Sequence, residues 1–169
     1  MVTDYRAFGM TVIGASHIKS CTVCQDFSLS CELPDRRISV VCDGHGGADY
    51  FRSDRGSRFA AEAFTECMKD PDVISVLSAT ATQKQQSVRI EQLIKSIIAR
   101  WNELVERDIK EHSFGEDELS GVSEKARKRY ETGQRLQSAY GTTLIGVILT
   151  ENFWLGLQIG DGKCVAVSK

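Results

Sequence analysis

The chain lacks any long hydrophobic run, and its amino terminus lacks the basic stretch followed by an apolar one that marks a secretory leader. No run approaches the roughly 20 apolar residues of a membrane-spanning helix, and the first ten residues read MVTDYRAFGM. We therefore expect a cytoplasmic protein with no membrane partner. Excess charge is also lacking: the formal net charge is -2 with 26% charged residues, which gives no electrostatic basis for nucleic-acid binding. No internal repeat is evident, and no feature sets an oligomeric state.

Paired cysteine motifs are scarce, although the chain contains six cysteines. Cys21 and Cys24 form one C-x-x-C pair, whereas a zinc ribbon requires a second close pair. Cys31 and Cys42 fall inside strand patterns, where a reduced cysteine behaves as a small apolar residue. We interpret the cysteines as reduced structural thiols, and a zinc or redox role stays open as the alternative.

What is present fits a single domain over residues 1–169. The chain is 41% apolar, which suffices for one core of this size. Its most informative segment, Val41-Cys42-Asp43-Gly44-His45-Gly46-Gly47, follows a β-branched run that predicts a buried strand. Asp43 thus stands at a strand end, among glycines that leave main-chain groups open to an ion or phosphate. The alternative is a tight turn in which Asp43 is an ordinary turn residue.

Strand and helix patterns come in blocks along the chain. Two segments with apolar residues at helical spacing, Arg55 to Met68 and Ser87 to Glu111, lie between β-rich ends. Short links, Glu151-Asn152 and Asp161-Gly162, predict hairpins near the carboxyl terminus. We expect an α+β fold with antiparallel pairing and both helices on one face of the sheet. The predicted strands are Met10 to Ser16, Asp26 to Cys31, Ile38 to Cys42, Thr142 to Thr150, Phe153 to Ile159 and Lys163 to Val167.

The segment from Ser113 to Ser138 is polar until Leu136, and it predicts a surface insertion or flexible loop. It carries the basic run Lys125 to Arg129, which we interpret as a solvated helix face. Binding of an anionic substrate or partner by this run stays open. The apolar stripe of the longer helix is interpreted as core, with a partner-binding face as its alternative.

Four short motifs, taken in order, resemble those of the type 2C metal-dependent serine/threonine protein phosphatases. They are Cys24-Gln25-Asp26, the DGHGG segment with its preceding strand, Tyr140-Gly141-Thr142-Thr143, and Ile159-Gly160-Asp161-Gly162. The resemblance runs from about Thr11 to Val167, and it is to the amino-terminal part of a bacterial-like domain. It implies an antiparallel β-sandwich flanked by helices. It also implies metal-dependent hydrolysis of phosphoserine and phosphothreonine in a phosphorylated protein substrate.

The resemblance assigns roles to particular residues. Asp26 and Asp43 match metal-site carboxylates, Gly44 offers its main-chain carbonyl, and Asp161 matches a residue of a weaker third metal position. The implied cofactors are two or more Mn²⁺ or Mg²⁺ ions, which prefer oxygen ligands and activate water for attack on phosphorus. His45 would protonate the leaving alkoxide, since imidazole titrates near neutrality. For Asp161 a plain turn residue is the alternative.

Three departures from the family pattern stand out. Gln25 replaces the first acid of the usual acidic pair, which lowers the charge available to a metal. Cys21 stands where the family has its phosphate-binding arginine; Lys19 is the nearest cation, with a solvated loop lysine as its alternative role. The family's downstream Asp-Gly and Asp-Asn motifs would lie beyond Lys169, so we expect a domain that is incomplete at its carboxyl terminus and a chain that is inactive by itself.

Two features of the sequence point to other functions. His45-Gly46-Gly47-Ala48 resembles the oxyanion-hole segment of esterases, but the chain contains no G-x-S-x-G nucleophile motif. The stronger alternative is a phosphatase-like regulatory or binding module without activity. Gln25 and Cys21 favour this alternative, whereas the intact DGHGG motif argues against it.

Overall fold

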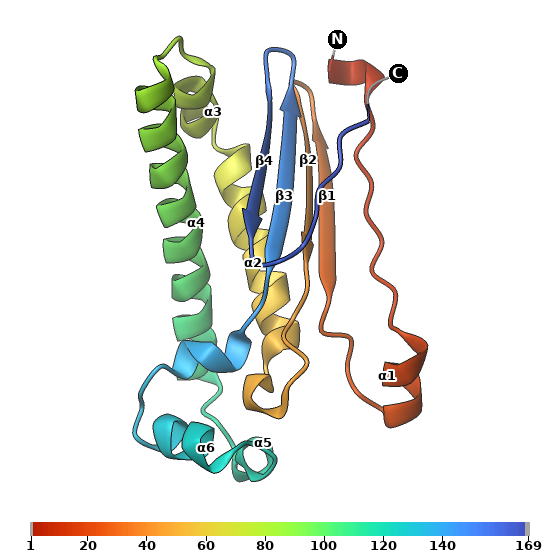
Figure 1. Cartoon of the computed structure of the whole chain (residues 1–169), viewed down its shortest axis with the longest axis vertical. Coiled ribbons are helices and arrows are strands. Elements are labelled where there is room, and N and C mark those ends of the chain that lie inside the picture. Colours follow the sequence, from red (N-terminus) through yellow and green to blue (C-terminus); the bar gives the residue numbers. More distant parts are fainter. Residues whose placement is uncertain (1, 168–169) are drawn as a thin grey trace.

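The computed structural model describes residues 2–167, which contain a single antiparallel sheet with helices packed around it (Figure 1). The strands pair in chain order, with β2 and β3 at the centre. This arrangement confirms the α+β class, the antiparallel pairing and four of the six predicted strands. The described residues contain no second sheet, so the expected β-sandwich is not seen in them. The strands are β1 Phe27–Leu33, β2 Arg36–Cys42, β3 Leu144–Thr150 and β4 Trp154–Ile159.

The first and last of the predicted strands are wrong. Residues 10–14 are unpaired, and the remainder of the first predicted strand lies in helix α1 (Ala15–Ser20). This segment crosses the outer face of β1, where the Thr11 and Ser28 hydroxyls share a 2.8 Å hydrogen bond, so side-chain contacts replace a strand ladder. Residues 163–167 also cross the sheet without forming a strand (Figure 1). Gly160, with φ of 104°, turns the backbone away before the predicted Asp161-Gly162 hairpin can form.

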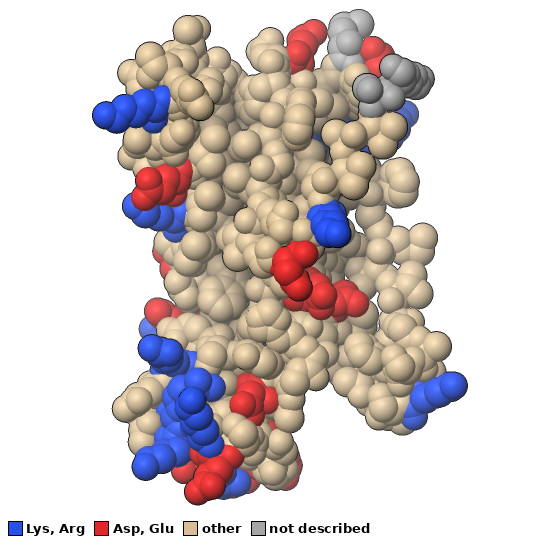
Figure 2. All heavy atoms as spheres, in the orientation of Figure 1, with Lys and Arg blue, Asp and Glu red and all other residues tan. Residues whose placement is uncertain are grey.

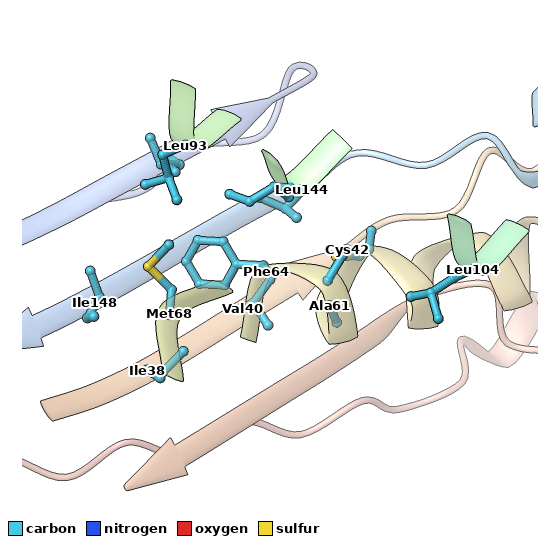
Figure 3. Close-up of a cluster of buried hydrophobic side chains, with 14 of the residues drawn as sticks. Ile38, Val40, Cys42, Ala61, Phe64, Met68, Leu93, Leu104, Leu144 and Ile148 are labelled. Carbon is cyan, nitrogen blue, oxygen red and sulfur yellow. The ribbon is translucent and has the colours of Figure 1, made fainter. Parts of the chain in front are cut away.

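Two long helices, α2 (Ser53–Lys69) and α4 (Gln83–Glu111), confirm the predicted helical segments. α2 contacts β1, β2 and β3, and α4 packs along α2. Phe64 of α2 occupies the space left by the missing side chain of Gly146, and Figure 3 shows its ring between helix and strands. Both helices therefore contribute to the core on this face. Its labelled members in Figure 3 are Ile38, Val40, Cys42, Ala61, Phe64, Met68, Leu93, Leu104, Leu144 and Ile148.

Residues 113–138, expected as a surface insertion or flexible loop, are folded and packed. They form α5 (Glu116–Ser120), α6 (Glu124–Glu131) and the start of the 3-10 helix η3 (Leu136–Tyr140). The expectation failed because a few well-spaced apolar and aromatic residues anchor an otherwise polar segment. Together with residues of α4 and of the end of η3 they build a second core, which contains Val105, Leu119, Ala126, Tyr130, Ala139 and Tyr140.

A buried arginine joins this second core to the start of α2. Arg52 is 3% exposed and donates to Glu118 Oε1 at 2.7 Å and to the Tyr140 hydroxyl at 2.7 Å. The Tyr140 hydroxyl in turn donates to Asp108 at 2.6 Å. Because each buried polar group has a partner, the network fixes η3 and the strand that follows it.

The remaining elements are short. Within residues 2–167, no helix combines the length and the apolar character needed to cross a bilayer. The short helices are η1 Val2–Asp4, η2 Ala48–Tyr50 and α3 Pro71–Ser78.

Candidate functional site

The loop after β2 is fixed by main-chain pairing to a segment 100 residues later in the chain. The Thr143 amide donates to the Asp43 carbonyl at 2.8 Å, and the His45 amide donates to the Gly141 carbonyl at 2.9 Å. The Thr142 hydroxyl also donates to the Asp43 carbonyl at 3.0 Å, while the Asp43 amide donates to Thr143 Oγ1 at 3.2 Å. Two of the four sequence motifs, DGHGG and YGTT, are therefore docked on each other.

Gly44 lies where three backbone segments meet. A Cβ on Gly44 would lie 2.5 Å from the carbonyl oxygen of Gln25 and 2.8 Å from that of Ser53. Gly44 and Thr142 face each other in an isolated antiparallel bridge. The hydrogen bonds of this bridge are made by the flanking residues and not by Gly44 or Thr142. The carbonyl of Gly44 is thus left outside the bridge, as a ligand role requires.

Asp26 and Asp43 lie next to each other at neighbouring strand ends. Burial raises the pKa of Asp26, the charge of Asp43 and a side-chain hydrogen bond to it raise that pKa further, and His17 opposes the shift. Two adjacent carboxylates disfavour each other's ionisation unless a cation lies between them. The pair therefore offers a cation a favourable position.

An open cavity of about 510 Å³ holds this acidic pair. Asp26, Asp43 and Asp161 all line it, together with Thr143. Asp161 reaches the cavity because the chain turns across the outer face of the sheet after β4. Figure 2 shows acidic side chains gathered near the middle of the visible face. The structure thus brings three of the predicted metal-site side chains to one cavity.

The donors match a hard divalent cation in kind, but they are few. Carboxylate and main-chain carbonyl oxygens are the ligands that Mg²⁺ and similar ions prefer. Within the described residues, however, no three Asp, Glu, His or Cys side chains form a group that could hold a metal ion. Of the predicted donors, Asp26, Asp43 and Asp161 line the cavity, whereas Gly44 is buried beside it and is not part of the lining.

His45 is exposed and lies between this loop and a second cavity. Its ring makes an edge contact with the Tyr50 ring, with centroids 4.9 Å apart. A Cβ on Gly141 would lie 2.5 Å from His45 Cδ2, so the glycine of YGTT allows the ring to lie against the backbone. His45, Thr142 and Thr143 line the second cavity. The ring is therefore positioned by Tyr50 and by the backbone at Gly141, while the residue stays exposed to solvent.

The residues at the expected phosphate-binding positions lie elsewhere. Lys19 is exposed on α1, and Cys21 follows that helix with a left-handed backbone (φ 53°). Asp26 lines the cavity of about 510 Å³ and a further cavity of about 540 Å³, and neither Lys19 nor Cys21 lines either of them. Gln25 is 9% exposed and packs under Gly44, so its neutral side chain has a structural role in the loop.

Two arginines that sequence reasoning missed lie beside Asp26. Arg55 and Arg58 of α2 line a cavity of about 540 Å³ with Asp26. Arg55 is paired with Asp108 at 2.9 Å, whereas the exposed Arg58 guanidinium lies 5.3 Å from the centroid of the Phe27 ring. No local signal marks Arg58, because an arginine on a helix surface is ordinary; only the fold places it near the acidic pair.

The cysteines show no metal cluster in the part of the chain that is described. All six are free thiols, including Cys21 and Cys24. Burial raises the pKa of the Cys42 thiol to about 12, which keeps it protonated and unreactive.

Comparison with known proteins supports the motif pattern. The family model for protein phosphatase 2C matches residues 13–169, which include the acidic pair, the DGHGG loop and the YGTT segment. Neither the curated proteins nor the solved structures contain a match to the chain. The match covers far more than half of the sequence, and the chain belongs to the protein phosphatase 2C family.

Proposed function

We propose that this domain hydrolyses phosphoserine and phosphothreonine in proteins with a water molecule activated by Mn²⁺ or Mg²⁺. The observation that carries the proposal is the contact between Asp26 and Asp43 in an open cavity whose rim is built by the DGHGG and YGTT motifs. Family membership supports the reaction class. The geometry supports the assignment of roles to this chain's own residues.

Asp26, Asp43 and the carbonyl of Gly44 would hold the metal, with Asp161 contributing from the cavity wall. The bound ions would supply an activated water and neutralise charge on the phosphoryl oxygens. Asp43 can do this only while its backbone stays fixed, and three hydrogen bonds to Thr142 and Thr143 fix it. The two threonines are therefore positioning residues for the acidic pair.

His45 is the proton donor in this proposal. A serine or threonine alkoxide is a poor leaving group unless it is protonated as the bond to phosphorus breaks, and an imidazolium can supply that proton near neutral pH. The ring is held against Tyr50 and the backbone of Gly141, and His45 is exposed to solvent. It can therefore face a substrate oxygen and be reprotonated from solvent.

Arg58 is the cation that we place on the substrate phosphate, in preference to Lys19. Arg58 shares a cavity with Asp26 and has an exposed guanidinium. A guanidinium can donate two parallel hydrogen bonds to phosphate, which an ammonium cannot. This assignment lets α2 replace the arginine that the family carries at the position of Cys21.

The test compares two leaving groups in the presence of Mn²⁺ or Mg²⁺. His45→Ala should slow hydrolysis of a phosphoserine peptide about 100-fold or more, while p-nitrophenyl phosphate, whose phenolate departs without a proton, loses much less. Equal losses on both substrates would remove His45 from the acid role. The assay uses a protein that contains the complete domain, because residues 1–169 alone are expected to be inactive. If that protein releases phosphate from neither substrate in a metal-dependent manner, the domain is a phosphatase-like binding module and the proposal fails.

A further inference from the structure

A second cavity of about 440 Å³ lies next to His45, on the side of the loop away from Asp26. Its volume falls within the range of about 300 to 1,000 Å³ that is typical of small-ligand sites. The cavity lies between α4, the start of β3 and the end of β4. It is therefore a feature of the packed fold.

Most of the cavity wall is apolar. Ile97, Ile98 and Trp101 of α4 face Leu144 and Ile159 of the sheet across it. The indole N–H of Trp101 already donates to a main-chain carbonyl, that of Gly56, at 3.0 Å. The Trp101 ring thus needs no polar partner from a ligand and is free to pack against an apolar group.

The polar end of this cavity is the candidate active site itself. His45, Thr142 and Thr143 form that end, and Thr143 also lines the acidic cavity with Asp26 and Asp43. Because the two cavities share Thr143, a phosphoryl group held at the acidic pair would lie next to the polar end of the apolar cavity. Under the proposed function the leaving oxygen faces His45, so the chain attached to that oxygen continues toward the apolar cavity.

We propose that this cavity is a specificity subsite that binds a bulky apolar side chain one or two residues from the phosphorylated serine or threonine. This inference rests on the proposed function, because His45 defines which end of the substrate enters. Successive residues of an extended peptide are about 3.3 to 3.6 Å apart, so a flanking side chain can reach a cavity that starts at His45. The substrate class is a phosphoprotein with an aromatic or branched aliphatic residue beside the phosphorylated one.

The first test measures kcat/KM, in a protein that contains the complete domain, on phosphoserine peptides that differ only in the flanking residues, Phe or Gly. Burying a large apolar side chain favours the Phe peptide by about 10- to 100-fold. Ile98→Trp fills the cavity and should bring the ratio near one, whereas Val88→Trp, on the same helix but outside the cavity wall, should leave it unchanged. The two positions are matched in exposure, 42% for Ile98 and 47% for Val88. A wild-type ratio near one, or a ratio that survives Ile98→Trp, overturns the inference.

A second test reads the cavity without turnover. The chain has two tryptophans, so Trp154→Phe leaves Trp101 as the sole reporter. Phosphonate analogues of the Phe and Gly peptides, which cannot be hydrolysed, are titrated in Mg²⁺ while Trp101 emission is recorded. A blue shift with the Phe analogue alone supports the subsite even if no peptide is hydrolysed and the proposed function fails. No shift with the Phe analogue, or the same shift with both analogues, overturns the subsite.

Discussion

Replacing Asp43 by Asn should weaken Mn²⁺ binding strongly, because it removes one of the two carboxylates that lie in contact. Two unit charges 4 Å apart interact by about 1 kcal/mol in water and by about 4 kcal/mol at an effective dielectric constant of 20. Asp43 is exposed, so the value for water is a lower bound on the interaction energy between Asp43 and a unit positive charge. Doubled for a dication, it gives about 2 kcal/mol, or roughly 30-fold in the dissociation constant.

Isothermal titration calorimetry with Mn²⁺ measures this change. With so few donors, the wild-type dissociation constant should be on the order of 10⁻⁴ to 10⁻³ M, and Asp43→Asn should bring binding below detection. Asp117→Asn removes the same charge from an exposed position on α5 and should leave the titration unchanged. Identical titrations for the wild type and Asp43→Asn would refute Asp43 as a ligand. An equal loss in Asp117→Asn would show that only overall charge matters.

Three further outcomes follow from the structure. Mn²⁺ affinity should fall as pH falls through the raised pKa of Asp26, because its protonated carboxyl cannot bind the ion; a pH-independent affinity between pH 4 and 7 would contradict this. Arg58→Ala should weaken competitive inhibition by inorganic phosphate about 5- to 30-fold, with partial recovery in Arg58→Lys and no change in Arg107→Ala, an exposed arginine on α4. Gly44→Ala should lower the free energy of unfolding by about 1 to 3 kcal/mol, since its Cβ would lie 2.5 Å from a backbone oxygen; thermal melting that is unaltered would show that the loop can move aside.

The sequence predicted strands best where the pairing partner of the strand follows directly in the chain. β3 and β4 are joined by a short turn and pair with each other, so local hydrophobicity sufficed to find them. The predicted strand at residues 10–16 had the right composition, but it lies across the face of β1, with a side-chain hydrogen bond, and continues into α1 instead of pairing along the free edge of β1. Strand propensity alone cannot supply the partner.

The candidate site, too, was predictable only where a local motif marks the residue. Asp26, Asp43 and His45 were predicted because family motifs mark them, whereas Arg58 has no such mark and shares a cavity with Asp26 only through the packing of α2 on β1. Lys19 was predicted because it is the cation nearest in sequence to Cys21, where the family has its arginine; it is exposed on α1 and does not line the acidic cavity. Distance along the chain was a poor guide because the site is assembled from segments that are remote in sequence.

The docking of the DGHGG loop on the YGTT segment also sets the order in which the protein can be made. Asp43 and Thr143 are 100 residues apart, and a ribosome adds about 5 to 20 residues per second. The acidic loop therefore waits roughly 5 to 20 s after its synthesis before the strand that holds it emerges. Until then β2 has only β1 beside it, and its other edge is open to pairing with any extended chain. During synthesis, the nascent protein is thus most exposed to misassembly at the segment that leads into the candidate site.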